Sequence, residues 1–110
     1  MSKVHIINYF AKKINAEKYL EIGIDQAATF DNVDVDFKLG VDPYVDRADI
    51  VKKTSDEFFM TNNEKFDIIF IDGLHHVDQV YRDIINSLAC LNPEGIIICH
   101  DMLPTSEDMQ

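Results

Sequence analysis

The chain has 110 residues, of which 46% are hydrophobic, and its formal net charge at pH 7 is −10. This length and composition suit one small domain with a buried core, so we expect a single domain over residues 1–110. The acidic balance argues against nucleic acid or an anionic membrane surface as a partner, because like charges repel.

The cysteines and the N-terminus indicate a cytoplasmic protein. Cys90 and Cys99 are the only cysteines, each lies in an apolar pattern, and CxxC spacing is absent. Both are therefore expected to be small buried side chains in a reducing compartment. The N-terminal stretch MSKVHIINYFAKK lacks the apolar segment of a signal peptide, and no apolar run reaches the length of a membrane span.

The first half of the chain predicts one helix followed by three strands. Helical spacing, with Ser2 available as the N-cap, connects the apolar residues Val4, Ile7, Phe10, Ala11 and Ile14. Strands are expected at 18–24 (KYLEIGI), at 37–42 (FKLGVD, stopped by Pro43) and, with a less apolar pattern, at 50–55 (IVKKTS).

The second half predicts two helices and two strands. A short helix over 55–62 would have Ser55 as its N-cap and Asp56 and Glu57 in its first turn, where the helix dipole favours acids. The strand KFDIIFID (65–72) precedes a second helix. Its core stripe comprises Val77, Val80, Tyr81, Ile84, Leu88 and Leu91. The sequence NPEG breaks that helix before the strand GIIIC (95–99).

Strands that alternate with helices through short loops predict an α/β fold with a parallel sheet covered on both faces. Acids end or follow the predicted strands at Glu21, Asp42, Asp56, Asp72 and Asp101, the last preceded by His100. Because these ends share one edge of a parallel sheet, which is where such sheets bind ligands, the acids predict a site for a cation or for ligand hydroxyls and amines. For Asp42, which precedes Pro43, a purely structural cap is a serious alternative.

The turn after the first strand narrows the ligand class. It reads GIDQAATF, with one glycine and an acid, and therefore lacks the G-x-G-x-x-G pattern of a dinucleotide site. A receiver domain shares a strand like DIIFID, but it carries paired acids after the first strand and a lysine after the fifth. Gly23 and His100–Asp101 stand there instead.

Several motifs together resemble class I S-adenosylmethionine-dependent methyltransferases, whose fold is Rossmann-like. The motifs are YLEIGIDQAAT, GVDP, TSDEFF, FDIIFIDGLHHVDQVYRDI and LNPEGIIICHD, and they extend from about Lys18 to Asp101. The closer likeness is to the small-molecule O-methyltransferase branch with macrocin- and catechol-type members. The resemblance implies S-adenosylmethionine as the cofactor and methyl transfer to a hydroxyl of a small-molecule acceptor.

The resemblance also implies roles for individual residues. Glu21 and Gly23 match the motif beside the methionine part of the cofactor, and Asp42 matches the acid that accepts hydrogen bonds from the ribose hydroxyls. Ser55 and Asp56 match the segment near the adenine. Asp72 matches the acid at the end of the fourth strand, in the cofactor motif. In the metal-dependent branch of the family, the acids at the positions of Asp72 and Asp101 hold a divalent cation.

Two histidines add chemistry to this edge. His75 follows Asp72 by three residues, and its imidazole would take the proton from the acceptor hydroxyl; an N-terminal helix cap without chemistry is the alternative. His76 is expected to face solvent or to cap the helix. His100 stands beside Asp101 in the metal motif, and because imidazole is softer than carboxylate, a transition metal or no metal becomes an alternative to magnesium.

Two further departures from the family change the expectation. Ala27 stands where members often have a second glycine, which narrows the space for the amino-acid end of the cofactor. The family fold has seven strands and this chain supplies five, which predicts a domain truncated after the fifth strand. The alternative function is therefore a non-catalytic methyltransferase-like binding module or an inactive fragment. An uncovered fifth strand also predicts a homodimer through that edge.

Overall fold

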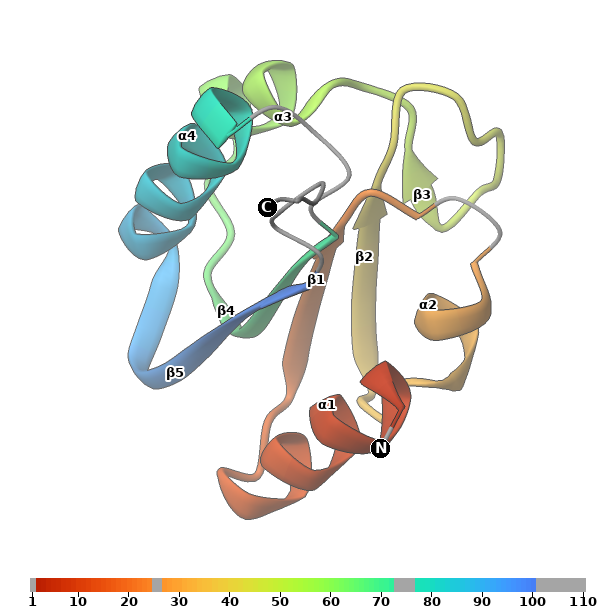
Figure 1. Cartoon of the computed structure of the whole chain (residues 1–110), viewed down its shortest axis with the longest axis vertical. Coiled ribbons are helices and arrows are strands. Elements are labelled where there is room, and N and C mark those ends of the chain that lie inside the picture. Colours follow the sequence, from red (N-terminus) through yellow and green to blue (C-terminus); the bar gives the residue numbers. More distant parts are fainter. Residues whose placement is uncertain (1, 25–26, 73–76, 101–110) are drawn as a thin grey trace, which may run out of the picture.

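The computed structural model describes residues 2–24, 27–72 and 77–100. Five parallel strands form one sheet in the order β3-β2-β1-β4-β5 (Figure 1). The elements, in chain order, are α1 (Lys3–Lys13), β1 (Lys18–Ile22), α2 (Ala28–Asn32), β2 (Phe37–Val41), β3 (Ile50–Val51), α3 (Ser55–Thr61), β4 (Phe66–Asp72), α4 (Val77–Ala89) and β5 (Leu91–His100). The predicted parallel α/β fold is therefore confirmed.

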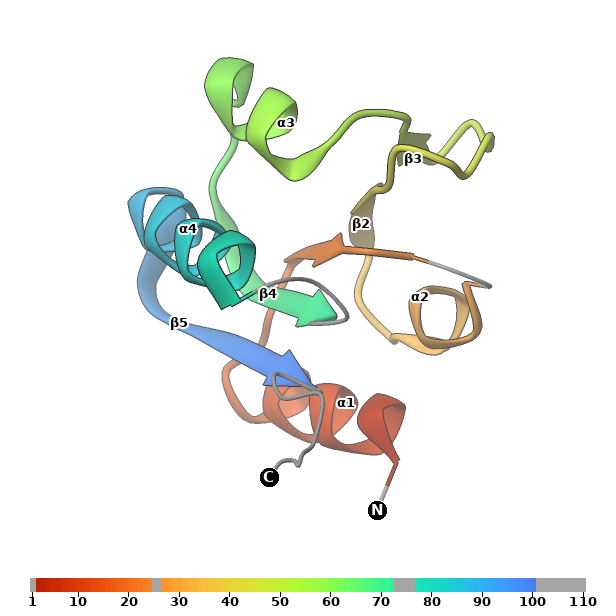
Figure 2. The same cartoon turned by 45° about the horizontal axis from the view of Figure 1, so that its top comes forward.

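The helices form a layer on each face of the sheet. Figure 2 shows α1 and α2 on one face, and α3 and α4 on the other. One apolar cluster joins Ile7 of α1 and Phe30 of α2 to Tyr19, Ile68 and other side chains of the sheet. The opposite cluster joins α3 and the other face of the strands, with the buried members Leu20, Ile22, Val41, Phe58, Phe66, Ile69, Ile71 and Cys90. This two-sided burial explains the near-continuous apolar runs of β1 and β4.

The helix ends agree with the sequence at α1 and correct it at α3. The Ser2 side chain caps α1 by accepting a hydrogen bond from the His5 amide. The N-cap of α3, however, is Thr54 and not Ser55. Thr54 accepts from the Glu57 amide while the Glu57 carboxylate accepts from the Thr54 amide, which satisfies two donors at once.

Three elements differ from the prediction. The strand β3 covers only Ile50–Val51 of the predicted 50–55, and the five-residue helix α2 was not expected. The strand β5 begins at Leu91 and includes the NPEG sequence that was expected only to end the preceding helix. A register shift between Phe66 and Ile68 accommodates these residues, and Glu94 adopts a left-handed φ of 68° within the irregular segment.

Only part of the predicted apolar stripe of α4 is buried. Val80 is buried, and Ile84 and Leu91 pack against the core, but Val77, Tyr81 and Leu88 are exposed. Asp83 and Ser87 are buried in their place. The reason is tertiary: polar side chains of α3 and α4 meet along this side of the helix, so the apolar flank of α4 is turned toward solvent.

The sequence also predicted two buried cysteines and no membrane-spanning segment. Cys90 is buried, Cys99 is half-buried, and both are free thiols. Burial raises the pKa of each thiol, so neither has the character of a reactive thiolate. Among the described residues, no helix is both long enough and apolar enough to cross a membrane.

Candidate functional site

The candidate site lies at the carboxyl edge of the sheet, around the boundary between β1 and β4. At this boundary the strand order reverses, since β2 and β3 lie on one side of β1 and β4 and β5 on the other. Open α/β sheets bind ligands in the crevice formed at such a reversal. The chain brings Glu21 and Asp42 to this edge from β1 and β2, and Asp72 and His100 from β4 and β5.

Glu21 is a buried carboxyl with a hydroxyl donor nearby. Its side chain is 1% exposed and accepts a hydrogen bond of 2.6 Å from the hydroxyl of Tyr19, two residues earlier on the same strand face. Burial raises the pKa of Glu21 to about 7; the Tyr19 hydrogen bond opposes this rise, the Asp72 charge adds to it, and Lys3 opposes it. The group therefore changes charge near neutral pH.

Asp72 and His100 lie opposite each other at the ends of neighbouring strands. They are register partners in the β4–β5 pairing. The Asp72 carboxylate is 3.9 Å from the ammonium of Lys3, which brings a cation from α1 to this edge. The His100 ring stacks on Phe70 with a centroid distance of 6.4 Å. Two of the three predicted metal ligands are therefore adjacent, and the third, Asp101, lies outside the described residues, as does His75.

Asp42 is held rigidly where β2 ends. Its carboxylate accepts from the Ile24 amide at 2.9 Å and from the Tyr44 amide at 2.8 Å, and the residue is buried. The bond to Tyr44 is a local turn bond and not a helix cap, since the next element along the chain is the strand β3. The bond to Ile24 also ties the carboxylate to the chain that leaves β1. Together these two bonds fix the acid beside the first loop.

The loop after β1 places two residues in the left-handed region. Gly23 has a φ of 88° and donates its amide hydrogen bond to the Val41 carbonyl. Ala27 has a φ of 64°, a conformation in which glycine carries no steric cost. The Ala27 side chain is buried in the α1/α2 core together with Ile24 and Phe30. The position at which the family often has glycine is therefore one whose backbone favours glycine.

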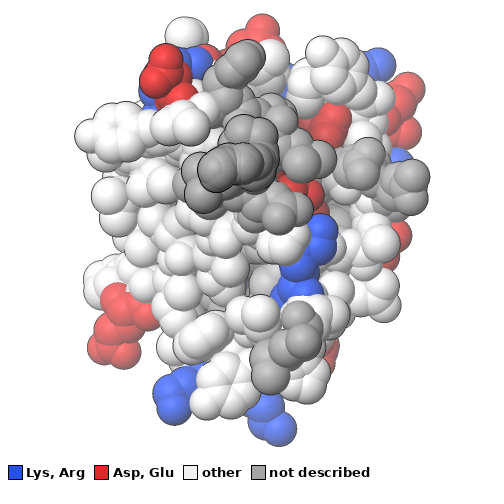
Figure 3. Space-filling model, in the orientation of Figure 1, with Lys and Arg blue, Asp and Glu red and all other residues white. Residues whose placement is uncertain are grey.

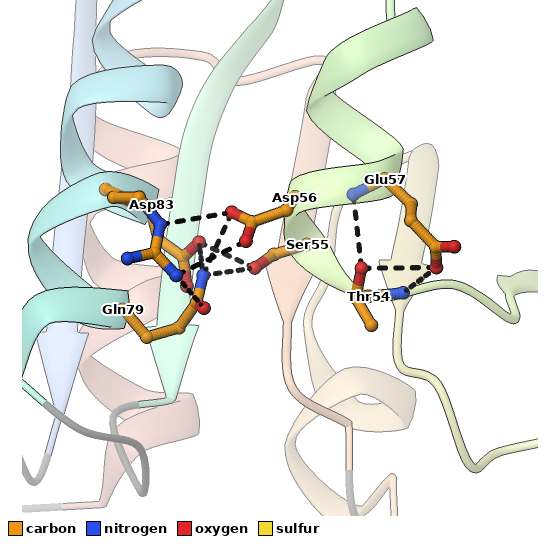
Figure 4. Close-up of polar contacts among 7 residues, drawn as sticks. Thr54, Ser55, Asp56, Glu57, Gln79 and Asp83 are labelled. Atoms are coloured by element: carbon orange, nitrogen blue, oxygen red, sulfur yellow. Dashed lines mark hydrogen bonds and ion pairs between the residues drawn. The ribbon is translucent and has the colours of Figure 1, made fainter.

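Ser55 and Asp56 are engaged by α4. The Ser55 hydroxyl donates to the Asp83 carboxylate at 2.6 Å, and the Gln79 amide donates to Ser55, Asp56 and Asp83 (Figure 4). Arg82 forms an ion pair with Asp56 at 3.3 Å. Hydrogen bonds from Gln79 and Arg82 lower the pKa of Asp56. These contacts make the two residues part of the α3–α4 junction.

Asp83 is the residue of this region that sequence reasoning missed. It is fully buried and joins the N-terminus of α3 to the middle of α4. In the sequence Asp83 appears as an acid beside the apolar stripe of the helix. An acid that faces solvent would produce the same pattern. Ser87, one turn later, is also fully buried, and its hydroxyl has no hydrogen-bond partner in the part of the chain that the structure describes.

Among the described residues, no three His, Cys, Asp or Glu side chains are grouped so that they could hold a metal ion. In that part of the chain the donors at the carboxyl edge are thus the carboxylates of Glu21, Asp42 and Asp72 and the imidazole of His100. Such a set can accept hydrogen bonds from hydroxyls and can stabilise a ligand ammonium. Its negative charge is opposed by the Lys3 ammonium at the Asp72 side.

Comparison with known proteins identified one family and a set of similar folds. A family model described as a methyltransferase domain matches residues 3–102. The fold is similar to that of the SAH-bound methyltransferase PaMTH1 from Podospora anserina, with a TM-score of 0.66 and 18% identity over 92% of this chain and 54% of that one. It is also similar to a putative caffeoyl-CoA O-methyltransferase from Staphylococcus aureus, with a TM-score of 0.68 and 17% identity over 89% and 56%.

These matches also show how much of the similar proteins this chain corresponds to. It spans about half the length of each of the two similar structures. Their low identity makes them evidence for the fold. A search of curated proteins gave no significant match.

Proposed function

Because the chain belongs to the methyltransferase-domain family, we propose that it binds S-adenosylmethionine and transfers its methyl group to a hydroxyl of a small-molecule acceptor. The family match covers residues 3–102, and one structure of similar fold was obtained with SAH bound. The other similar structure is a putative O-methyltransferase, which supports a hydroxyl as the acceptor.

The observation that carries the proposal is the geometry of Asp42. A buried carboxylate, oriented by the amides of Ile24 and Tyr44, lies beside the loop that follows β1. Ribose presents two vicinal hydroxyls, and a carboxylate can accept from both. The fixed orientation favours this recognition, because little conformational entropy is lost when the ligand binds.

The other end of the cofactor would lie toward Glu21. S-Adenosylmethionine carries an α-ammonium, and the β1–β4 boundary holds Glu21 and Asp72; the Asp72 charge contributes to the raised pKa of Glu21 because like charges disfavour each other. A ligand ammonium here would favour the charged form of Glu21, as the Lys3 ammonium does. Gly23, with its left-handed φ, leaves the backbone of the loop open for close approach.

Methyl transfer requires the acceptor oxygen to attack the sulfonium methyl while its proton leaves. We assign His75 as the proton acceptor on the strength of its motif alone. Asp72 and His100, with Asp101, would hold a divalent ion, magnesium or a transition metal. Their mixed oxygen and nitrogen donors and the pairing of β4 with β5 fit that role. When bound, such an ion would lower the pKa of the acceptor hydroxyl.

The second candidate function is a non-catalytic module that binds the cofactor. The observation in its favour is Ala27, a non-glycine residue in a left-handed conformation at the loop where members often have glycine. A protein that binds S-adenosylmethionine but transfers no methyl group to any hydroxyl acceptor would support this candidate.

Calorimetry with S-adenosylhomocysteine tests cofactor binding. Asp42→Ala should weaken binding by about 1.5–3 kcal/mol, because a charge-assisted acceptor is lost. Asp36→Ala is the matched control: it removes the same charge at an exposed position just before the opposite end of β2, and should leave affinity unchanged. Unfolding of both variants should be measured in parallel, since Asp42 also holds two backbone amides. Equal affinity of a folded Asp42→Ala and its parent would refute the ribose assignment.

A further inference from the structure

Lys3 brings a cation from α1 to the acidic carboxyl edge of the sheet. Its ammonium lies 3.9 Å from the Asp72 carboxylate, and its charge also opposes the rise in the pKa of the buried Glu21 carboxyl. Figure 3 shows a small basic area in the middle of this face, bordering an acidic one. In a chain whose net charge is −10, a cation is thus held where a ligand would meet two acids.

The ammonium of Lys3 retains its capacity to donate hydrogen bonds. A separation of 3.9 Å from Asp72 is beyond the range of an N–H···O hydrogen bond, which is about 2.7–3.2 Å. The Lys3 side chain is 37% exposed and donates to no residue that the structure describes. Lys38, the second lysine whose charge acts on Glu21, instead donates to the Phe30 carbonyl at 2.8 Å. Of these two lysines, Lys3 is therefore the one available to a ligand anion.

The stability of α1 does not explain the position of Lys3. It is the first residue of the helix, where the positive end of the helix dipole disfavours a cation, and the first turn holds no acid to compensate. The last turn, where cations are favourable, already carries Lys12 and Lys13. The ion pair with Asp72 is long and partly exposed, so it adds little stability. A role in binding accounts for a cation at this position.

We propose that Lys3 binds the α-carboxylate of S-adenosylmethionine, while the acids of the β1–β4 boundary face its α-ammonium. This inference rests on the proposed function, in which the amino-acid end of the cofactor lies toward Glu21. The α-ammonium and the α-carboxylate are bonded to the same carbon, so a site that binds both must present opposite charges close together. The Lys3 ammonium and the Asp72 carboxylate have that spacing.

The balance of charge at this edge favours a ligand that carries both charges. A ligand ammonium beside Glu21 and Asp72 would repel the Lys3 ammonium unless an anion lay between the two cations. The α-carboxylate is such an anion, and Lys3 can donate a charge-assisted hydrogen bond to it. A ligand that keeps the ammonium but lacks the carboxylate would meet that repulsion without compensation. Lys3 should therefore favour the complete amino-acid end and disfavour the decarboxylated one.

Calorimetry of the full 110-residue chain with three ligands tests this role of Lys3. S-Adenosylhomocysteine carries both charges, its decarboxylated analogue carries only the ammonium, and 5′-methylthioadenosine carries neither. Lys3→Met should bind S-adenosylhomocysteine about tenfold more weakly than the parent, because a charge-assisted hydrogen bond is lost. It should bind the decarboxylated analogue at least as tightly as the parent does, and 5′-methylthioadenosine with unchanged affinity. Lys3→Arg, which keeps the cation, should restore most of the lost affinity.

Lys12→Met is the matched control, since it removes the same charge from the opposite end of α1 and should change none of the three affinities. Equal binding of S-adenosylhomocysteine by Lys3→Met and the parent would overturn the inference. So would a similar loss for all three ligands, because Lys3 would then act on the shape of the site. Both outcomes leave the proposed function intact. A parent that binds none of the three ligands would overturn the proposed function and this inference with it.

Discussion

Replacing Glu21 with glutamine should stabilise the protein at alkaline pH. The glutamine side chain is neutral at every pH, has nearly the same shape, and keeps an oxygen that can accept from the Tyr19 hydroxyl. In the parent, burial raises the pKa of this carboxyl from its ordinary 4.5 to about 7. The folded state therefore holds a proton at pH values where the unfolded chain has released it.

The sign and the size of the effect follow from this difference. A raised pKa in the folded state means that the contribution of Glu21 to stability is fully present below about pH 4.5 and is lost as pH rises through about 7. The difference between 4.5 and about 7, at 1.36 kcal/mol per pKa unit, corresponds to about 3 kcal/mol. Glu21→Gln should therefore match the parent near pH 4.5 and exceed its free energy of unfolding by up to about 3 kcal/mol at pH 8.

Urea unfolding followed by circular dichroism is a suitable assay, because the chain has no tryptophan. The quantity of interest is the difference between variant and parent at each pH, in which the other titrating groups cancel. Glu17→Gln is the matched control, since it makes the same change at an exposed position just before the same strand. A pH-independent difference for Glu21→Gln, or one that shrinks toward pH 8, would refute the assignment of a buried neutral carboxyl.

Two further changes test the α3 cap and the metal site. Thr54→Ala should lower the free energy of unfolding by about 1 kcal/mol, because it removes the capping box with Glu57, whereas Thr61→Ala at the exposed end of α3 should change it little; equal effects would assign the cap elsewhere. In thermal-shift measurements, magnesium, manganese or zinc should raise the melting temperature of the parent and fail to raise that of Asp72→Asn. A shift that persists when Asp72→Asn is combined with Asp101→Asn would place the ion at another site.

Local sequence patterns predicted most of the sheet. The apolar runs of β1 and β4 are buried on both faces, which is why they lack alternation and why the parallel arrangement could be inferred. The parallel order then brought Glu21, Asp42, Asp72 and His100 to one edge, as the positions of the strand ends predicted. The cofactor and metal roles of these residues stay predictions.

The misses have separate physical causes. Helix α2 is five residues long, too short to give a helical period. At the start of α3, Thr54 and Ser55 are adjacent hydroxyl residues, and either could serve as the N-cap. The glutamate three residues after Thr54 was the available signal, because Thr54-x-x-Glu57 is a capping box. The irregular start of β5 depends on its pairing with β4, which a local turn pattern does not reveal.

The sequence could not predict which side of α4 is buried, and the reason is different. An apolar stripe shows which side of a helix avoids water, but it does not show which neighbour covers that side. Asp83 is buried because Ser55 and Gln79 supply donors to its carboxylate. Those partners come from two helices, so their meeting is a property of the assembled fold. The same contacts explain why Ser55 and Asp56, predicted to lie near an adenine, are bonded to α4.

The central position of β1 has a consequence for how the chain folds during synthesis. β1 pairs with β2 over a short interval of sequence, but its other neighbour is β4, where Tyr19 lies opposite Ile68. A nascent chain that has emerged only as far as β3 therefore has β1 with one edge still unpaired and both apolar faces incompletely covered. Closing this long interval costs chain entropy before any contact compensates for it. The arrival of β4 from the ribosome should thus be the event that commits the chain to its native sheet.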